Sequence, residues 1–189
     1  MKQIINNALI SVSDKTELSR LLKILKKYNV NIISSGGTYN FIKNLGYKCT
    51  DVSTYTGFKE MLDGRVKTLH PKIHAGILHE RTNKKHSTEM SKRKFPSIDL
   101  IIVNFYPFQK VVTTSNKSQN IIENIDIGGP TMVRAAAKNF KNVTTITNKN
   151  DYPELINEIK KNKGTTTLKF RELMASKAFG LTAYYDAMI

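Results

Sequence analysis

The sequence predicts an α/β protein in which a mostly parallel central sheet lies between layers of helices, a three-layer sandwich. Two observations support this fold class. Helix and strand patterns alternate along most of the chain, as in βαβ units. Residues 98–106 form a nearly unbroken apolar run, which is typical of a parallel strand buried on both faces. The length of 189 residues fits one full domain with an appended helix.

The first half of the chain predicts two strand–helix units and a third strand. A short buried strand at residues 8–12 leads into four leucines that recur at i, i+3, i+4 and i+7, the spacing of one helix face. Asp14 and Glu17 predict a capping box at the start of that helix. A second strand, 30–34, precedes another helical stretch, and a third strand is expected near 48–52. The four leucines are Leu18, Leu21, Leu22 and Leu25.

The second half begins irregularly and then returns to alternation. We expect irregular chain over 55–78, a polar surface helix or loop over 83–94 and a solvated loop over 110–120. A long irregular segment in a compact domain is often functional, so residues 55–78 are candidates for a site. The remaining expected elements are a central strand at 98–106, a helix at 130–139, a strand at 143–147, a helix at 152–161 and a terminal helix at 165–189.

The composition limits the class of protein. The apolar runs are far shorter than the ~20 residues of a membrane span, and the N-terminus lacks a secretory signal. We therefore expect a cytoplasmic protein without membrane contact. The single cysteine, Cys49, excludes an intramolecular disulfide and favours a reducing compartment. The formal net charge of +15 is compatible with a polyanionic partner, an anionic substrate or neither.

Two junctions between a strand and a helix carry groups that suit an anion. Glycines at such a junction let backbone N–H groups approach a phosphate, and the helix N-terminus adds its positive end. Taken alone, the second junction could equally be a tight turn that needs a positive φ, and the first could be a capped helix start. Together, two hydroxyl-bearing junctions on neighbouring strands predict a phosphate pocket. The first junction contains Ser13, Asp14 and Lys15, and the second contains Ser35, Gly36, Gly37 and Thr38.

A basic segment, residues 64–72, places two cations, a hydroxyl and an imidazole in irregular chain. A solvated basic loop is the usual explanation, but the apolar residues of this segment suit a mobile exposed loop poorly. His70 and His74 are four residues apart, the spacing of metal ligands on a helix. Pro71 disfavours such a helix and residues 65–79 contain no Cys, Asp or Glu, so we expect no metal site.

Two further segments carry polar side chains where a predicted strand ends or a predicted helix begins. Residues 104–107 close the central strand, and within 125–139 a Gly-Gly pair leads into a helix with proline near its first turn. In the plain interpretation Asp126 caps this helix and Lys138 lies at its solvated end. Three consecutive alanines beside Lys138 indicate instead close packing against a neighbour or a ligand.

In sequence order these segments resemble the inosine monophosphate (IMP) cyclohydrolase domain of the bifunctional purine-biosynthesis proteins that also carry an AICAR transformylase. The resemblance covers nearly the whole chain from residue 8 onward. It implies a methylglyoxal-synthase-like, Rossmann-like fold. The implied activity is the last step of purine synthesis, in which 5-formamidoimidazole-4-carboxamide ribotide (FAICAR) closes its second ring to give IMP and water. The matching segments are 11–16, 35–38, 55–58, 64–71, 104–108, 125–139, 177–179 and 182–186.

The resemblance also implies roles for individual residues. Lys67 and Lys138 would be a cationic acid/base pair, and Asp126 would position or deprotonate the attacking nitrogen. Tyr106 and Asn104 would orient the substrate and donate hydrogen bonds. The implied catalytic residues are Lys67, Tyr106, Asp126 and Lys138. The implied substrate-binding residues are Ser13, Asp14, Lys15, Ser35, Gly36, Gly37, Thr38, Arg65, Val66, Thr68, Asn104, Ile127 and Gly128.

Expected partners follow from the same resemblance. They are a purine ribonucleotide (FAICAR or IMP), a second copy in a homodimer and a separate transformylase domain or protein. No metal or organic cofactor is expected, because the substrate already carries the formyl group. We expect residues 1–163 to form the cyclohydrolase domain and residues 164–189 to begin the connection to a transformylase domain that this chain lacks. No transformylase or folate activity is therefore expected from it.

Two other classes of function stay open at this point. The first is a non-catalytic nucleotide-binding or regulatory domain of the same fold, like the allosteric domain of carbamoyl phosphate synthetases; the full set of implied catalytic residues argues against it. The second is a nucleic-acid-binding protein driven by the net charge. The lysines of this chain are dispersed along the sequence without any known nucleic-acid-binding motif, so only non-specific binding would be expected.

Overall fold

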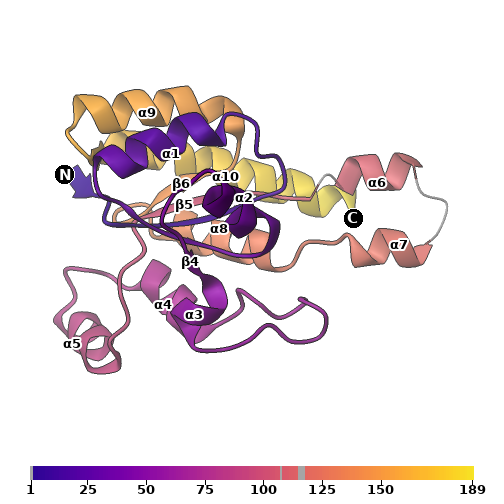
Figure 1. Cartoon of the computed structure of the whole chain (residues 1–189), viewed down its shortest axis with the longest axis horizontal. Helices are drawn as coiled ribbons and strands as arrows, with labels where there is room; N and C mark the ends of the chain where they lie inside the picture. Colours follow the sequence, from indigo (N-terminus) through magenta and orange to yellow (C-terminus); the bar gives the residue numbers. More distant parts are fainter. Residues whose placement is uncertain (1, 107, 115–117) are drawn as a thin grey trace.

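The computed structural model describes residues 2–106, 108–114 and 118–189, and its centre is a five-stranded sheet (Figure 1). Every neighbouring pair of strands in this sheet is parallel, so the predicted fold class is confirmed. In sheet order the strands are β4 (Thr50–Asp51), β3 (Asn31–Ser34), β2 (Asn7–Val12), β5 (Leu100–Asn104) and β6 (Thr144–Ile146).

Helices cover both faces of the sheet. They are α1 (Leu18–Lys27), α2 (Gly36–Asn44), α3 (Val52–Thr56), α4 (Pro71–Leu78), α5 (Lys84–Arg93), α6 (Phe108–Thr114), α7 (Ser118–Glu123), α8 (Gly128–Lys138), the short 3-10 helix η1 (Lys149–Asp151), α9 (Tyr152–Lys161) and α10 (Leu168–Met188). Figure 1 shows α1 and α9 on one face and α3, α4 and α8 on the other. The long helix α10 packs against α8 and the outer strand β6.

Strand β2 shows how one apolar run contributes to two cores. Ala8 and Ile10 pack with α1 and α9, whereas Leu9 packs with α4 and α8, because successive side chains of a strand point to opposite faces. None of the three is more than 1% exposed. The four leucines of α1 are fully buried against the first of these faces, which confirms the predicted helix face.

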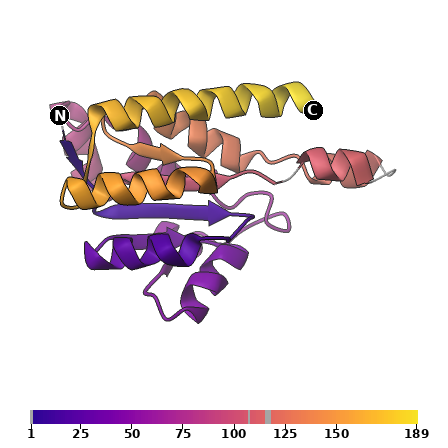
Figure 2. The same cartoon turned by 90° about the horizontal axis from the view of Figure 1, so that it is seen from above.

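The order of the strands creates a crevice at the centre of the sheet. From β2 the chain adds β3 and β4 on one side, and later β5 and β6 on the other. This reversal is a topological switch point, and ligands of open α/β sheets bind there, outside the carboxyl ends of the strands. In Figure 2 the indigo arrow of β2 points toward the end of the molecule from which α6 and α7 project. The two predicted strand-to-helix junctions lie at this edge.

Two local predictions about helix starts are wrong. Residues 71–78 form helix α4, with Pro71 at its first position and His70 as N-cap, where the His70 Nδ1 accepts the Lys72 N–H at 3.1 Å. Proline at this position loses no hydrogen bond, because the first N–H groups of a helix have no partner within it. The capping box is also absent: Glu17 occupies the N-cap position with a φ of 62°, and its side chain makes no capping bond.

The polar segments are more helical than their composition suggests. Residues 84–93 form α5, one of the two expected alternatives. The prediction of a solvated loop at 110–120 is wrong over the described residues, because residues 108–114 and 118–123 form α6 and α7. Residues 115–117 lie outside the described residues. Thr, Ser and Asn have modest helix propensity, and neither segment shows a strong apolar stripe. Figures 1 and 2 show both helices extending together beyond the end of the sheet.

The N-terminal strand pairs with the segment that precedes the last helix. Strand β1 (Lys2–Ile4) and strand β7 (Thr165–Thr167) form a two-stranded antiparallel sheet, so the expectation that residues 165–167 open the last helix is wrong. Thr167 instead caps α10 by accepting the Phe170 N–H at 3.3 Å. The division into 1–163 and 164–189 stays a prediction; in the structure, side chains of α10 belong to both hydrophobic clusters. No helix of the described residues is long and apolar enough to cross a membrane.

Candidate active site

Most of the predicted site residues lie at the carboxyl edge of the sheet. They follow β2, β3 and β5 or lie in the segments that precede α4 and α8, so they come together from five separate parts of the sequence. A cavity of about 510 Å³ adjoins this edge and is lined in part by Gly36, Phe58, Glu60 and Lys67. A second hollow of about 420 Å³ lies between α4 and α5 and contains none of the predicted site residues.

Asn104 holds the loop that follows β2. Its Oδ1 accepts the Ser13 N–H at 2.6 Å, the Ser13 hydroxyl at 2.8 Å and the Asp14 N–H at 3.3 Å. The Ser13 hydroxyl also lies 3.0 Å from the Phe105 carbonyl oxygen. These contacts join the ends of two neighbouring strands at the switch point. The side chains of Ser13 and Asn104 therefore shape the site by fixing backbone.

The N-terminus of α2 offers unpaired donors. Ser35 is its N-cap residue and makes no side-chain capping bond, and Gly36 has a φ of +53°, a conformation that favours glycine. Gly36 and Gly37 are exposed. The first N–H groups of a helix lack partners within it and carry its positive end, so this turn suits an anion.

Two lysines approach the same turn from different loops. A Cβ atom added at Gly37 would lie 3.8 Å from the Lys15 Nζ, and one added at Gly36 would lie 3.6 Å from the Lys67 Nζ. Two ammonium groups therefore flank the uncapped start of α2. This juxtaposition brings two ammonium groups to the helix end, one of them paired with Glu60, and forms the strongest candidate for a phosphate site in the described chain.

The hydroxyl of Thr38 and the carboxylate of Asp14 serve the local structure. The Thr38 Oγ1 accepts the Val12 N–H at 3.1 Å and donates to the Val12 carbonyl oxygen at 2.9 Å, which ties α2 to the end of β2. The Asp14 carboxylate accepts the Thr16 N–H at 2.9 Å and pairs with the Lys149 Nζ at 2.7 Å. The bond with Lys149 holds the pKa of Asp14 well below its usual range.

The basic segment begins in a short hairpin, residues 61–66. Met61 and Val66 pair with each other, so Val66 has a structural role here, and Leu62 and Asp63 at the tip have positive φ angles. The cations beside this tip have acidic partners from elsewhere in the chain. Arg65 pairs with Glu123 of α7, and Lys67 pairs with Glu60 on the opposite arm.

Thr68 and Asp126 meet at the start of α8. A Cβ atom on Gly128 would lie 2.6 Å from the Thr68 Oγ1, and one on Gly129 would lie 2.4 Å from the Asp126 Oδ2, so both positions require glycine. The Asp126 Oδ1 accepts the Gly129 N–H at 2.8 Å, which confirms the plain interpretation of Asp126 as a cap. Burial raises the pKa of Asp126, against the opposing effect of hydrogen bonds from the Gly129 and Tyr106 N–H groups.

Apolar surface surrounds this carboxylate. Ile127 is 59% exposed and Tyr106 is 55% exposed, although both have large side chains, and the Asp126 between them in this region is half-buried. Exposed apolar groups at the rim of a polar site suit the flat faces of a planar ring. Pro107, which belongs to the same predicted segment as Tyr106, lies outside the described residues.

Lys138 is the one predicted catalytic residue that the chain does not bring to this edge. It ends α8, about 15 Å along the helix from Gly128 at a rise of 1.5 Å per residue. The neighbouring Asn139 side chain donates to the carbonyl oxygens of Ile77 and His79, at the far end of α4. The buried alanines beside Lys138 fulfil the expectation of close packing, since α8 packs on α4 and α10.

The two histidines of the basic segment have local roles. His70 caps α4, and burial lowers the pKa of His74 while a bond to the Thr68 backbone opposes that effect. The His74 Nε2 is buried and has no hydrogen-bond partner among the described residues. Within the same residues, no three His, Cys, Asp or Glu side chains are grouped as metal ligands.

Four contacts of the site came from residues that the sequence did not single out. Glu60, Glu123 and Lys149 are the ion-pair partners described above, and each lies on a segment whose position depends on the fold. The fourth is Tyr185 of α10, whose hydroxyl accepts the Asp126 N–H at 2.8 Å. Tyr185 lies in a segment that carries the family resemblance, so a signal for it was present in the sequence.

Comparisons with known proteins agree with this fold. Residues 17–131 match the family described as MGS-like domain, and residues 136–189 match the family described as AICARFT/IMPCHase bienzyme. A solved structure described as the crystal structure of ForH superposes with a TM-score of 0.85 at 29% identity, covering 96% of this chain and 93% of that chain.

Curated relatives share more of the sequence but are much longer. The chain is 49% identical over 185 residues to the Bifunctional purine biosynthesis protein PurH of Bradyrhizobium diazoefficiens, covering 98% of this chain and 35% of that protein. It is 50% identical over 182 residues to the protein of the same name from Clostridium perfringens, covering 96% of this chain and 36% of that protein. The chain thus spans about a third of the length of these relatives.

Proposed function

Because this chain belongs to the family of MGS-like domains, we propose that it is an IMP cyclohydrolase, a hydrolase that forms the second ring of a purine nucleotide. The relatives described as bifunctional purine biosynthesis proteins support this proposal, as does the match to the AICARFT/IMPCHase family. The observation that carries it is the convergence of Lys15 and Lys67 on the uncapped start of α2, with the half-buried Asp126 at the start of α8.

The substrate phosphate would bind at α2. Unpaired N–H groups of its first turn and the two ammonium groups can all donate to phosphate oxygens. Arg65 would add a further cation at the rim once it leaves Glu123. Only one phosphate is needed to occupy such a site, which fits a nucleoside monophosphate.

The spacing of the strands beneath the two sides of the site suits a nucleotide. β3 leads into α2 and β5 lies two strands away, so about 10 Å separates their ends at the usual strand spacing. Lys67 and Thr68 are adjacent in sequence and reach the two sides, Lys67 toward Gly36 and Thr68 toward Gly128. A nucleotide with its phosphate at α2 would therefore place its base against Ile127, Tyr106 and the Asp126 carboxylate.

The proposed reaction is internal to one substrate. The carboxamide nitrogen attacks the formyl carbon, and the formyl oxygen takes up a proton to give a ring carbinolamine. Loss of that hydroxyl, together with the proton of the former formamide nitrogen, releases water and leaves the ring double bond of IMP. Orientation of the two side groups is the first requirement, because the reacting atoms must be held within about 3–3.5 Å of each other.

Asp126 and Lys67 have suitable properties for the proton transfers. A carboxylate whose pKa is raised by burial is a stronger base than an exposed one, so Asp126 can accept the proton of the attacking nitrogen. The Lys67 ammonium can stabilise the charge that develops on the formyl oxygen. Tyr106 has an exposed side chain, and its backbone N–H bonds to the Asp126 carboxylate, so its phenol can orient the carboxamide.

Lys138 fits this proposal only with a second copy of the chain. Its place at the far end of α8 keeps its ammonium away from Asp126 of the same chain. We therefore propose that, in a homodimer, Lys138 of one subunit completes the site of the other. The relatives continue for about two thirds of their length beyond the matched region, and a transformylase domain or protein is proposed as the source of the substrate.

The test is direct. The purified chain, without folate and with a chelator present, is mixed with FAICAR, and IMP is measured against the spontaneous rate. We expect IMP formation well above that rate, and saturation with FAICAR. If the chain does not accelerate IMP formation but binds IMP tightly, the result would support the alternative of a non-catalytic nucleotide-binding domain. Binding of DNA that falls steeply with salt, without nucleotide binding, would support the nucleic-acid alternative.

A further inference from the structure

Tyr185 contacts both ends of the segment that carries α6 and α7. Between Phe105 and Asp126 the chain leaves the carboxyl edge of the sheet, forms α6 and α7, and returns to begin α8. Figures 1 and 2 both show α6 and α7 outside the body, at the same end as the C-terminus of α10. Tyr185 lies near that end of α10 and is only 3% exposed.

The contacts at the departing end are aromatic. The Tyr185 ring meets the Phe105 ring edge to face, with centroids 5.0 Å apart, and the Phe108 ring at 6.0 Å. All three side chains are buried. Such pairs contribute packing energy and fix the rings relative to each other. Phe105 lies between Asn104 and Tyr106, so this packing also fixes two residues of the proposed site.

The contact at the returning end is a hydrogen bond. The Tyr185 hydroxyl accepts the backbone N–H of Asp126 at 2.8 Å. The Asp126 side chain is held in turn by the Gly129 N–H, and its Oδ2 lies too close to Gly129 for any larger residue there. α8 therefore fixes the carboxylate relative to its own first turn, and Tyr185 fixes the same residue relative to α10.

We propose that Tyr185 is a positioning residue that sets the place of the Asp126 carboxylate, an inference that rests on the proposed cyclohydrolase function. Without the hydroxyl, the Asp126 N–H would lose its partner, and the backbone of Asp126 would lose its hydrogen bond to α10. Small displacements of a reacting group lower the rate far more than the affinity, because the rest of the substrate still binds. Tyr185 does not touch substrate in this proposal.

The decisive variant is Tyr185→Phe, which keeps the ring packing and removes the acceptor. Tyr184→Phe is the matched control, since Tyr184 is the preceding residue of the same helix and is 55% exposed. We expect Tyr185→Phe to lower kcat about 10- to 100-fold, the scale of a misplaced catalytic group. KM for FAICAR and the affinity for IMP should stay within about threefold, since phosphate binding is untouched.

Several results would overturn the proposal. One is a kcat for Tyr185→Phe equal to that of Tyr184→Phe. Another is a parallel loss of kcat, IMP affinity and thermal stability, which would indicate a merely structural residue. If the wild-type chain forms no IMP at all, the proposed function fails, and that outcome is separate from the first two.

Amide hydrogen exchange provides a measurement that needs neither activity nor a stable variant. In the wild-type chain the Asp126 N–H should exchange much more slowly than an unbonded loop amide, because a buried hydroxyl accepts it. Tyr185→Phe should remove that protection, and Tyr184→Phe should leave it unchanged. Fast exchange of the Asp126 N–H in the wild-type chain would show that the contact does not persist, and the proposal would be wrong.

Discussion

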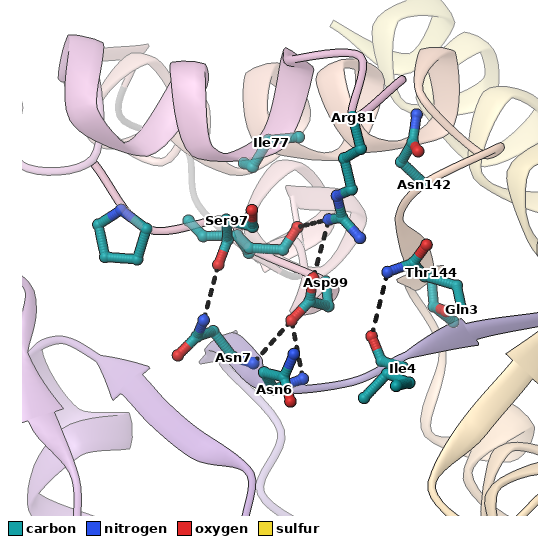
Figure 3. A network of polar contacts seen from close by, with 12 residues as sticks. Gln3, Ile4, Asn6, Asn7, Ile77, Arg81, Ser97, Asp99, Asn142 and Thr144 are labelled. Carbon is teal, nitrogen blue, oxygen red and sulfur yellow. Dashed lines mark hydrogen bonds and ion pairs between the residues drawn. The ribbon is translucent and has the colours of Figure 1, made fainter. Parts of the chain in front are cut away.

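The two edges of the central sheet use polar residues in opposite ways. At the amino edge, Asp99 is 2% exposed, and its carboxylate accepts the N–H groups of Asn6 and Asn7 at 2.8 and 2.9 Å while pairing with Arg81 at 2.9 Å (Figure 3). Arg81 also donates to the Ile98 carbonyl oxygen at 3.1 Å. These polar groups bond to the chain itself and hold the start of β2 against the segment before β5.

At the carboxyl edge, several donors are directed outward instead. The first turn of α2 is uncapped and exposed, and Lys15 and Lys67 lie against it. This difference indicates how a polar cluster can be assigned to fold support or to ligand binding before any ligand is seen. A cluster whose charges are buried and bonded to backbone supports the fold, whereas one that leaves helix-end donors and cations at the surface is prepared for an anion.

An Asp→Asn substitution at each edge should distinguish most strongly between a residue that supports the fold and one that takes part in the reaction. We expect Asp126→Asn to lower kcat about 10²- to 10⁴-fold, the usual contribution of a general base. The carboxamide oxygen of the new side chain can still accept the Gly129 N–H, so the melting temperature should change little. Turnover is measured with FAICAR, and melting is followed by circular dichroism. A variant with wild-type kcat would remove Asp126 from the mechanism.

The pH profile of the wild-type chain offers a check on that result. Burial raises the pKa of Asp126, so the carboxyl keeps its proton to a higher pH than an ordinary aspartate does. A base must be deprotonated, and the activity should therefore rise with pH through a limb whose midpoint lies above about 3.9. In Asp126→Asn this limb should disappear from kcat/KM.

The matching change at the amino edge is Asp99→Asn. It leaves the largely buried Arg81 guanidinium without its counter-charge, and breaking a buried pair in this way costs about 3 kcal/mol or more. For a chain of this size the melting temperature should fall by roughly 6–12 °C. The kcat of the folded fraction should equal that of the wild type, measured well below the melting transition. A stable variant with reduced kcat would mean that the two edges are coupled.

Lys15→Ala tests the phosphate site, with a smaller expected effect. The variant removes one of two ammonium groups at α2, and losing a charge-assisted bond should raise KM for FAICAR about tenfold while kcat stays near its wild-type value. Lys23→Ala is the control, since Lys23 is an exposed lysine of α1 and the variant has the same change in net charge. An equal rise of KM in both variants would indicate general attraction by the positive surface rather than a site.

The sequence predicted those features that depend on local geometry. The leucine spacing of α1 and the apolar run of β5 specified their elements, and the glycines after β3 marked the start of α2. Strand β7 could not be found in this way, because its partner is β1 at the other end of the chain. Glu123 and Lys149 were missed for the same physical reason, since each acquires its partner only when distant segments fold together, whereas Glu60 was missed because its pair with Lys67 depends on the local hairpin.

Lys138 is the exception, because its separation from Asp126 follows from the sequence alone. The two residues are twelve positions apart, and the ten-residue helix predicted at 130–139 lies between them and is about 15 Å long. The resemblance assigned both residues to one site. Lys138 and Asp126 can be far apart in one chain and still belong to one site only if that site combines two chains.

Mixing two inactive variants tests this sharing. Lys67→Ala and Lys138→Ala should each be nearly inactive alone. In a mixed dimer one of the two sites receives both wild-type lysines, so an equal mixture that exchanges subunits freely should recover about one quarter of the wild-type activity. Activity is measured after co-refolding, and a mixture of Lys67→Ala with Asp126→Asn serves as control, because both residues come from the same chain and no site is restored. Wild-type activity of Lys138→Ala alone would show that Lys138, like the polar groups of the amino edge, has no part in the reaction.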